Sequence, residues 1–142
     1  MGIYVNPGND LFAESVATEI YVDKTSLISY TNRVLGTEGK YICVSKPRRF
    51  GKTMAAKMLT AYYDYSVDSA LLFRGLEIEK DPSFWKHLGS YNVLFINMLD
   101  FLTEAGSVDQ MLIYLKELVL DDLEDCFPKE VKGSGRDFVS TF

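Results

Sequence analysis

The segment SKPRRFGKT (residues 45–53) ends in Gly51, Lys52 and Thr53, three residue types that together can hold a phosphate group. A glycine lets the backbone approach a phosphate without a Cβ in the way. The lysine ammonium can reach the β- and γ-phosphates of a nucleotide, and the threonine hydroxyl can ligate Mg²⁺. A helix that begins at Lys52 would add unpaired N–H groups and a partial positive charge. The triplet therefore predicts a site for ATP and Mg²⁺.

The start of this segment departs from the usual phosphate-binding (Walker A) pattern, G-x-x-x-x-G-K-[S/T]. Lys46 stands where the first glycine would be, and Pro47 stiffens the same place and removes one N–H donor. Lys46, Arg48, Arg49 and Lys52 gather positive charge without an intervening acid. This cluster indicates a polyphosphate site, or a phosphate site beside a nucleic-acid backbone. The other interpretation is that Arg48 and Arg49 pair with carboxylates elsewhere in the fold.

The residues around the loop predict a strand before it and a helix after it. KYICVS (40–45) is a short apolar run rich in β-formers, and KTMAAKMLTAYYDYS (52–66) is rich in Ala, Met and Leu. Its apolar side chains cover most of the helix, which indicates burial. A second apolar run, YNVLFINMLDF (91–101), is typical of a strand covered on both faces. Strands that alternate with helices predict an α/β fold with a parallel sheet.

Two further segments predict helices. Residues 23–35 place their apolar side chains on one helical face, and Asp23 or Thr25 can cap the start of this helix. A second helix begins at Ser107, which forms a capping box with Gln110 ahead of a long apolar stripe. The expected order is therefore helix, strand, loop, helix, small helices, strand and helix.

Composition and charge are those of an ordinary globular domain. The chain has 142 residues, of which 47% are hydrophobic and 25% charged, enough for one compact core. A net charge of −5 argues against a general nucleic-acid coat but not against a local basic site. Cys43 and Cys126 form no C-x-x-C pair, so no zinc or redox motif is visible. We expect a cytoplasmic protein without a membrane partner, because neither a signal peptide nor a long apolar span appears.

Several segments, taken in chain order, resemble one known family. They are YVDKTSLI (21–28), YICVSKPRRFGKT (41–53), LLFRGLEI (71–78) and HLGSYNVLFINMLDF (87–101). From about residue 12 to residue 101 the chain is similar to the N-terminal part of the prokaryotic AAA-ATPase-like proteins. Their divergent P-loop has the form P-R-R-F-G-K-[S/T] and commonly lacks the first glycine, so Lys46 fits the family.

The resemblance implies an ATP-Mg²⁺ site, with Lys52 and Thr53 as nucleotide contacts and Thr53 as a magnesium ligand. It also implies a P-loop NTPase-like, three-layer αβα fold with parallel strands. The family's Asp-Lys pair falls on Asp23 and Lys24. The resemblance gives this pair no role, and the structural interpretation is helix capping by Asp23. The candidate cofactor-binding residues are Pro47, Arg48, Arg49, Phe50, Gly51, Lys52, Thr53 and Met54.

Hydrolysis of ATP would need a further acid, the Walker B residue, to hold Mg²⁺. Asp100 is the candidate because it follows an apolar run, but Phe101 rather than a glutamate comes after it. In the family this acid lies further on, in a motif similar to L-I-D-E-x-D that this chain lacks. We therefore assign no catalytic residue and expect this chain alone to hydrolyse ATP poorly or not at all.

The resemblance also implies a truncated sheet, because the two predicted strands are not neighbours in AAA-like sheets. We expect residues 1–142 to be the N-terminal part of a P-loop AAA-ATPase-like domain. It would comprise a helical lead-in (1–36), a βαβα core (40–127) and a loose tail (128–142). The missing strands would come from the rest of a longer chain or from another chain; alternatively, the two predicted strands would pair directly with each other.

Family members often continue into a nuclease-like domain, which makes nucleic acid a further expected partner. The alternative function is a nucleic-acid-associated binding module that uses the basic loop, with vestigial nucleotide binding. A third option is a scaffold whose loop holds no ligand.

Overall fold

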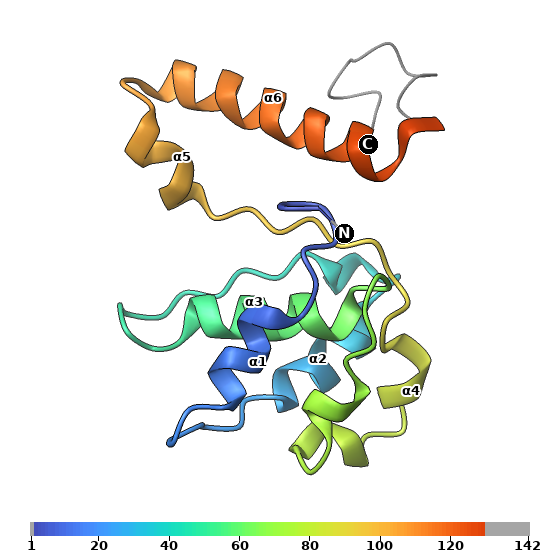
Figure 1. Cartoon of the computed structure of the whole chain (residues 1–142). Coiled ribbons are helices and arrows are strands. Elements are labelled where there is room, and N and C mark those ends of the chain that lie inside the picture. Colours follow the sequence, from blue (N-terminus) through green and yellow to red (C-terminus); the bar gives the residue numbers. More distant parts are fainter. Residues whose placement is uncertain (1, 130–142) are drawn as a thin grey trace. The chain divides into compact units, whose positions relative to one another are not determined.

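The computed structural model describes residues 2–129, and their regular elements are helices (Figure 1). Two compact units divide these residues, one formed by residues 8–93 and the other by residues 2–7 and 94–129. The α-helices are α1 (Asp10–Val16), α2 (Ser26–Val34), α3 (Lys52–Tyr63), α4 (Phe84–His87), α5 (Met98–Glu104) and α6 (Val108–Cys126). Three short 3-10 helices are η1 (Glu38–Lys40), η2 (Ala70–Phe73) and η3 (Glu77–Lys80).

The predicted α/β fold, a three-layer αβα arrangement with parallel strands, is wrong for the described residues. They contain no strand, and their β-pairing is limited to two isolated bridges, Val5 with Leu94 and Asp64 with Tyr91. The segment of residues 40–45, predicted as the strand before the loop, forms no strand: Lys40 ends η1, residues 41–45 have no regular structure, and Tyr41 is 83% exposed. A strand persists only when a neighbour satisfies its backbone N–H and C=O groups. Apolar, β-branched composition alone does not supply that neighbour.

The second predicted strand, residues 91–101, is wrong for the same reason. Tyr91 and Leu94 each form a single bridge, and α5 begins at Met98 in the second half of the apolar run. The side-chain oxygen of Asn97 accepts a hydrogen bond from the backbone N–H of Leu99 at 3.4 Å and caps α5. A polar residue inside an apolar run therefore starts a helix where the run itself predicted a strand.

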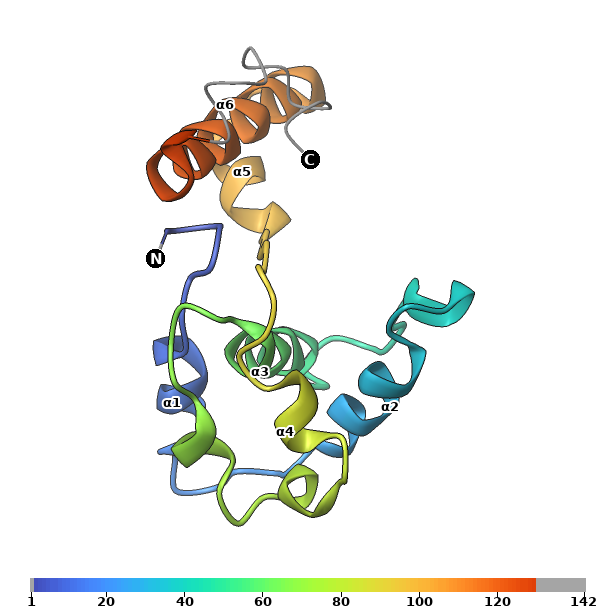
Figure 2. The same ribbon diagram turned by 90° about the vertical axis from the view of Figure 1, so that its right-hand side faces the viewer.

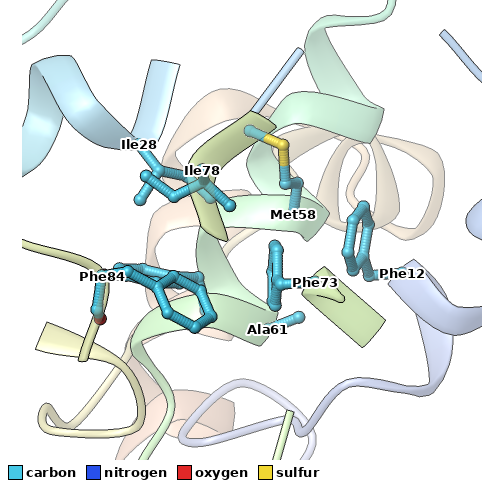
Figure 3. Close-up of a cluster of buried hydrophobic side chains, with 8 residues drawn as sticks. Phe12, Ile28, Met58, Ala61, Phe73, Ile78 and Phe84 are labelled. Carbon is cyan, nitrogen blue, oxygen red and sulfur yellow. The ribbon is translucent and has the colours of Figure 1, made fainter. Parts of the chain in front are cut away.

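The core of residues 8–93 surrounds the C-terminal half of α3. Figure 2 views α3 nearly end-on, with α1, α2 and α4 around it. Figure 3 shows the buried side chains that these helices contribute together with η2 and η3. The cluster consists of Phe12, Ile28, Met58, Ala61, Tyr62, Phe73, Ile78 and Phe84. At the other end of the helix, Lys52 and Thr53 are exposed. The core thus fixes α3 by one end and leaves its N-terminus accessible.

Buried hydrogen bonds tie α2 to α3. The Tyr62 hydroxyl donates to the Phe84 carbonyl at 2.7 Å and accepts from the Asn32 side chain at 3.0 Å. Burial raises the pKa of Tyr62 to about 12, so this hydroxyl keeps the proton that it donates. The Tyr63 hydroxyl donates to the Asn32 oxygen at 2.7 Å. Consecutive tyrosines at the end of α3 therefore both hold the same residue of α2.

The predicted helix over residues 23–35 is present in shortened form as α2. It begins at Ser26, and Thr25 at its N-cap position makes no side-chain capping bond. Leu35 follows the last helical residue, and Gly36 has φ +76°, the left-handed conformation that the predicted helix end requires.

The unit of residues 2–7 and 94–129 is built on α6. Val119 and Leu123 of α6 form a small core with Val5. The Asp122 carboxylate accepts backbone N–H bonds from Ile3, Tyr4 and Val5 at 2.9, 2.8 and 2.7 Å. The predicted cap of α6 is confirmed, since the Ser107 hydroxyl accepts from the Gln110 N–H at 3.2 Å. Most of the predicted loose tail, residues 130–142, lies outside the described residues.

Candidate functional site

The loop before α3 ends in a backbone conformation that favours glycine. Gly51 precedes the helix at φ +75°, and its carbonyl accepts the N–H of Ala55 at 2.9 Å. A side chain in this region costs about 1 kcal/mol or more. A Cβ on Gly51 would also lie 2.9 Å from the Lys24 Nζ atom. Arg49 also has a positive φ, +67°, although it is not a glycine. Two residues of the loop, Arg49 and Gly51, therefore adopt the left-handed backbone conformation.

Lys52, the first residue of α3, folds its side chain back over the loop. Its Nζ atom donates to the Pro47 carbonyl at 3.0 Å and also to the Lys46 carbonyl. The ammonium is therefore held by backbone oxygens of the loop that precedes its own helix. Thr53 is exposed in the same first turn.

A second lysine reaches this loop from outside it. The Lys24 Nζ atom donates to the carbonyl of Phe50 at 2.9 Å. Lys24 precedes α2, and its chain neighbours Asp23 and Thr25 form hydrogen bonds with η3 rather than with the loop. The sequence resemblance included Lys24 but gave it no role. The hydrogen bond between Lys24 and Phe50 joins residues 26 positions apart, so the sequence alone could not predict it.

Asp23 and Thr25 tie the start of α2 to η3. The Asp23 carboxylate accepts from the N–H and hydroxyl of Thr25 at 2.8 and 2.7 Å and from the Glu77 N–H at 2.8 Å. The Thr25 hydroxyl oxygen accepts from the Ile78 N–H at 3.1 Å. Neither side chain forms a capping hydrogen bond with α2. Instead, both fix the backbone on either side of Lys24 to η3.

We expect Asp23→Ala to destabilise the protein by about 1 kcal/mol at neutral pH, since several hydrogen bonds are lost at an exposed site. Burial alone would raise the pKa of the Asp23 carboxyl, but hydrogen bonds from Thr25 and Glu77 outweigh it and lower this pKa. A depressed folded-state pKa contributes stability above the unfolded value, near 3.8, and loses it as pH falls through the folded value. Urea unfolding from pH 7 down to pH 2 should show the difference between wild type and variant shrinking below about pH 4. A constant difference would contradict the prediction.

A cleft of about 510 Å³ opens between the loop and the start of α2, within the unit of residues 8–93. Its lining combines three lysines, Lys24, Lys46 and Lys52, with the aromatic rings of Tyr30 and Phe50 and with smaller apolar side chains. Asp23 is the one acid of this lining, and its carboxylate already accepts hydrogen bonds. The cleft is thus suited to a ligand that carries both negative charge and an apolar or aromatic part.

The structure brings some of the predicted site residues together and leaves others apart. Phe50, Gly51 and Lys52 line the cleft, whereas Arg48 and Arg49 are exposed on the loop. Within the described part of the chain, neither arginine forms an ion pair with a carboxylate. The lining also includes Leu27 and Tyr30 of α2 and Val44 before the loop, which sequence reasoning did not single out. Pro47 holds Lys52 through its carbonyl, and Met54 lies in the first turn of α3.

Asp100 lies in α5, in the unit of residues 2–7 and 94–129. Its carboxylate is exposed and accepts from the Asn97 amide at 3.0 Å. Across residues 2–129, no three His, Cys, Asp or Glu side chains gather as a metal site. The assignment of Thr53 and Asp100 to Mg²⁺ stays a prediction.

The described residues thus define a helical protein in which an exposed helix N-terminus and three lysines border one cleft. A family model described as "Predicted AAA-ATPase" matches residues 11–135. Because the match covers most of the chain, the chain belongs to this AAA-ATPase-like family, as the sequence resemblance predicted. Membership suggests nucleotide binding. No curated protein and no solved structure matches the chain. No helix among residues 2–129 has both the length and the apolar character needed to cross a bilayer.

Proposed function

We propose that this chain binds ATP-Mg²⁺ in the cleft at the N-terminus of α3. The observation that carries the proposal is the position of the Lys52 ammonium, which rests on the carbonyls of Lys46 and Pro47 at the start of the helix. Phosphate oxygens are better acceptors for an ammonium than neutral carbonyls are, because both partners are then charged. A nucleotide would draw Lys52 off the loop and onto its phosphates.

The helix supplies the second part of the phosphate site. The first N–H groups of α3 have no intrahelical partner, and the helix dipole places partial positive charge at this end. Gly51 leaves the approach to these groups open because it has no Cβ. The Thr53 hydroxyl is a hard oxygen ligand in the same turn and suits Mg²⁺, which prefers oxygen donors and phosphate oxygens together. The donor set therefore fits a phosphate-bound magnesium ion.

The base and ribose would lie in the same cleft. Tyr30 and Phe50 present aromatic rings, and Leu27, Val44 and Ala55 add apolar surface beside the lysines. Flat aromatic surface next to cationic groups is the combination that a nucleotide needs. The proposal concerns binding; hydrolysis would require an acid beyond those assigned to this site.

The test is a calorimetric titration of ATP-Mg²⁺ into the full chain. We expect saturable binding of one nucleotide per chain. It should weaken when Mg²⁺ is chelated, because the Thr53 hydroxyl would hold the ion and the ion would offset the negative charge of the phosphates. Absence of any heat or thermal shift with ATP-Mg²⁺ would refute the proposal.

The unpaired state of Arg48 and Arg49 favours one alternative, a nucleic-acid-associated module in which nucleotide binding is vestigial. Under that alternative, a single-stranded oligonucleotide would bind with a steep salt dependence. Arg48→Ala and Arg49→Ala would weaken oligonucleotide binding equally for all base sequences, and ATP would not compete with the oligonucleotide. Under nucleotide binding, ATP-Mg²⁺ binds whether or not the oligonucleotide does.

A further inference from the structure

We propose that Lys24 is a second phosphate-binding lysine of this site, supplied from outside the loop by the turn before α2. The inference rests on the proposed function, since it assigns a further ligand to the same nucleotide phosphates. Its basis is the placement of the Lys24 ammonium at the last residues of the loop, where the helix N-terminus begins.

One hydrogen bond and one short distance define that placement. The Lys24 Nζ atom lies 2.9 Å from the Phe50 carbonyl oxygen, and it lies 2.9 Å from the position that a Cβ on Gly51 would occupy. Lys24 also lines the cleft together with Lys52. The absence of a side chain at Gly51 therefore makes room for this ammonium, as well as for the close approach of a ligand.

The backbone that carries Lys24 is held on both sides. The Asp23 carboxylate accepts a hydrogen bond from the Glu77 N–H, and the Thr25 hydroxyl accepts one from the Ile78 N–H. Both neighbours of Lys24 are therefore fixed to η3. The outer residues of the Asp-Lys-Thr triplet thus serve structure, while the middle residue faces the loop. A fixed backbone with a long flexible side chain lets an ammonium change partners without moving the fold.

The charge of Lys24 is available to an anion. Within residues 2–129 the one polar partner of its ammonium is the neutral Phe50 carbonyl, although Asp23 is its chain neighbour. The Asp23 carboxylate is engaged by N–H and hydroxyl donors instead. An ammonium has three N–H donors, of which this contact uses one. Two donors remain for phosphate oxygens, and Lys24 adds to Lys52 the positive charge that a triphosphate requires.

The experiment compares Lys24→Met with wild type in calorimetric titrations of ATP-Mg²⁺ and ADP-Mg²⁺. Methionine keeps the length and apolar stem of lysine and removes the charge. We expect ATP-Mg²⁺ affinity to fall about ten-fold or more, the usual effect of losing a hydrogen bond to a charged group. The loss should be smaller for ADP, because ADP carries less negative charge for the ammonium to attract, and Lys24→Arg should restore most of the affinity. Lys86→Met in α4, which removes one exposed charge outside the cleft, should stay within about two-fold of wild type.

A purely structural brace predicts a different result. If Lys24 only holds the loop, ATP and ADP affinities fall by the same factor and the unliganded variant melts at a lower temperature; that result overturns the inference. If the wild type binds ATP and Lys24→Met binds it with the same affinity, the inference is also overturned, whereas the proposed function is not. Absence of binding by the wild type overturns the proposed function and this inference together.

Discussion

Lys52→Ala is expected to weaken ATP-Mg²⁺ binding at least about 100-fold, beyond the range of an ordinary titration. The wild-type ammonium would contact two phosphates, and each hydrogen bond to a charged group is worth about 1.5–3 kcal/mol. A 100-fold loss corresponds to about 2.7 kcal/mol, so losing two such contacts is sufficient. Alanine keeps the helix, because it is the best helix former at the first position of α3. Calorimetry and the thermal shift caused by ATP-Mg²⁺ both measure the effect.

Two controls separate this loss from a loss of structure. Lys52 is exposed, and the core lies at the opposite end of α3, so the unfolding free energy should change by no more than about 0.5 kcal/mol. Lys57→Ala, a substitution of the same type within the same helix but outside the cleft lining, should leave binding near wild type. Wild-type affinity in Lys52→Ala would show that the loop does not hold the nucleotide.

Phe73→Ala is expected to be the most damaging core substitution, at about 3–5 kcal/mol of unfolding free energy. The Phe73 side chain is 0% exposed and stacks on Phe12 at 5.0 Å between ring centroids. Its ring also meets Tyr62 and Phe84 edge-on at 5.6 and 6.4 Å. Removing it opens a cavity among four elements, α1, α3, η2 and α4, which cannot all close inward together. The expected loss is a large part of the roughly 5–15 kcal/mol that stabilises a typical domain.

Urea denaturation followed by far-ultraviolet circular dichroism measures this loss. Leu71→Ala is the matched control, because Leu71 belongs to the same 3-10 helix and is 74% exposed. Its substitution should cost no more than about 0.5 kcal/mol. Equal effects of the two substitutions would contradict the assignment of Phe73 to the core, and with it the anchoring of α3.

Local chemistry in the sequence was enough to predict several parts of this molecule. The helix after the loop, the cap of α6 by Ser107 and the helix end at Gly36 follow from side chains and backbone angles within a few residues. Such signals act over one turn, so neighbours in the chain decide them. The family likewise followed from motifs in order, and the match over residues 11–135 confirms it.

Tertiary structure decided the features that join distant segments. The apolar runs at residues 40–45 and 91–101 predicted strands, yet within the described residues no extended neighbour pairs with either as a ladder, and both remain unpaired or turn into helix. A β-strand is defined by its partner, which its own sequence does not contain. Lys24 shows the same principle at the site, since its approach to Phe50 depends on the anchoring of Asp23 and Thr25 to η3. The sequence determined the loop and its helix by itself, whereas only long-range contacts could decide which side chains surround them.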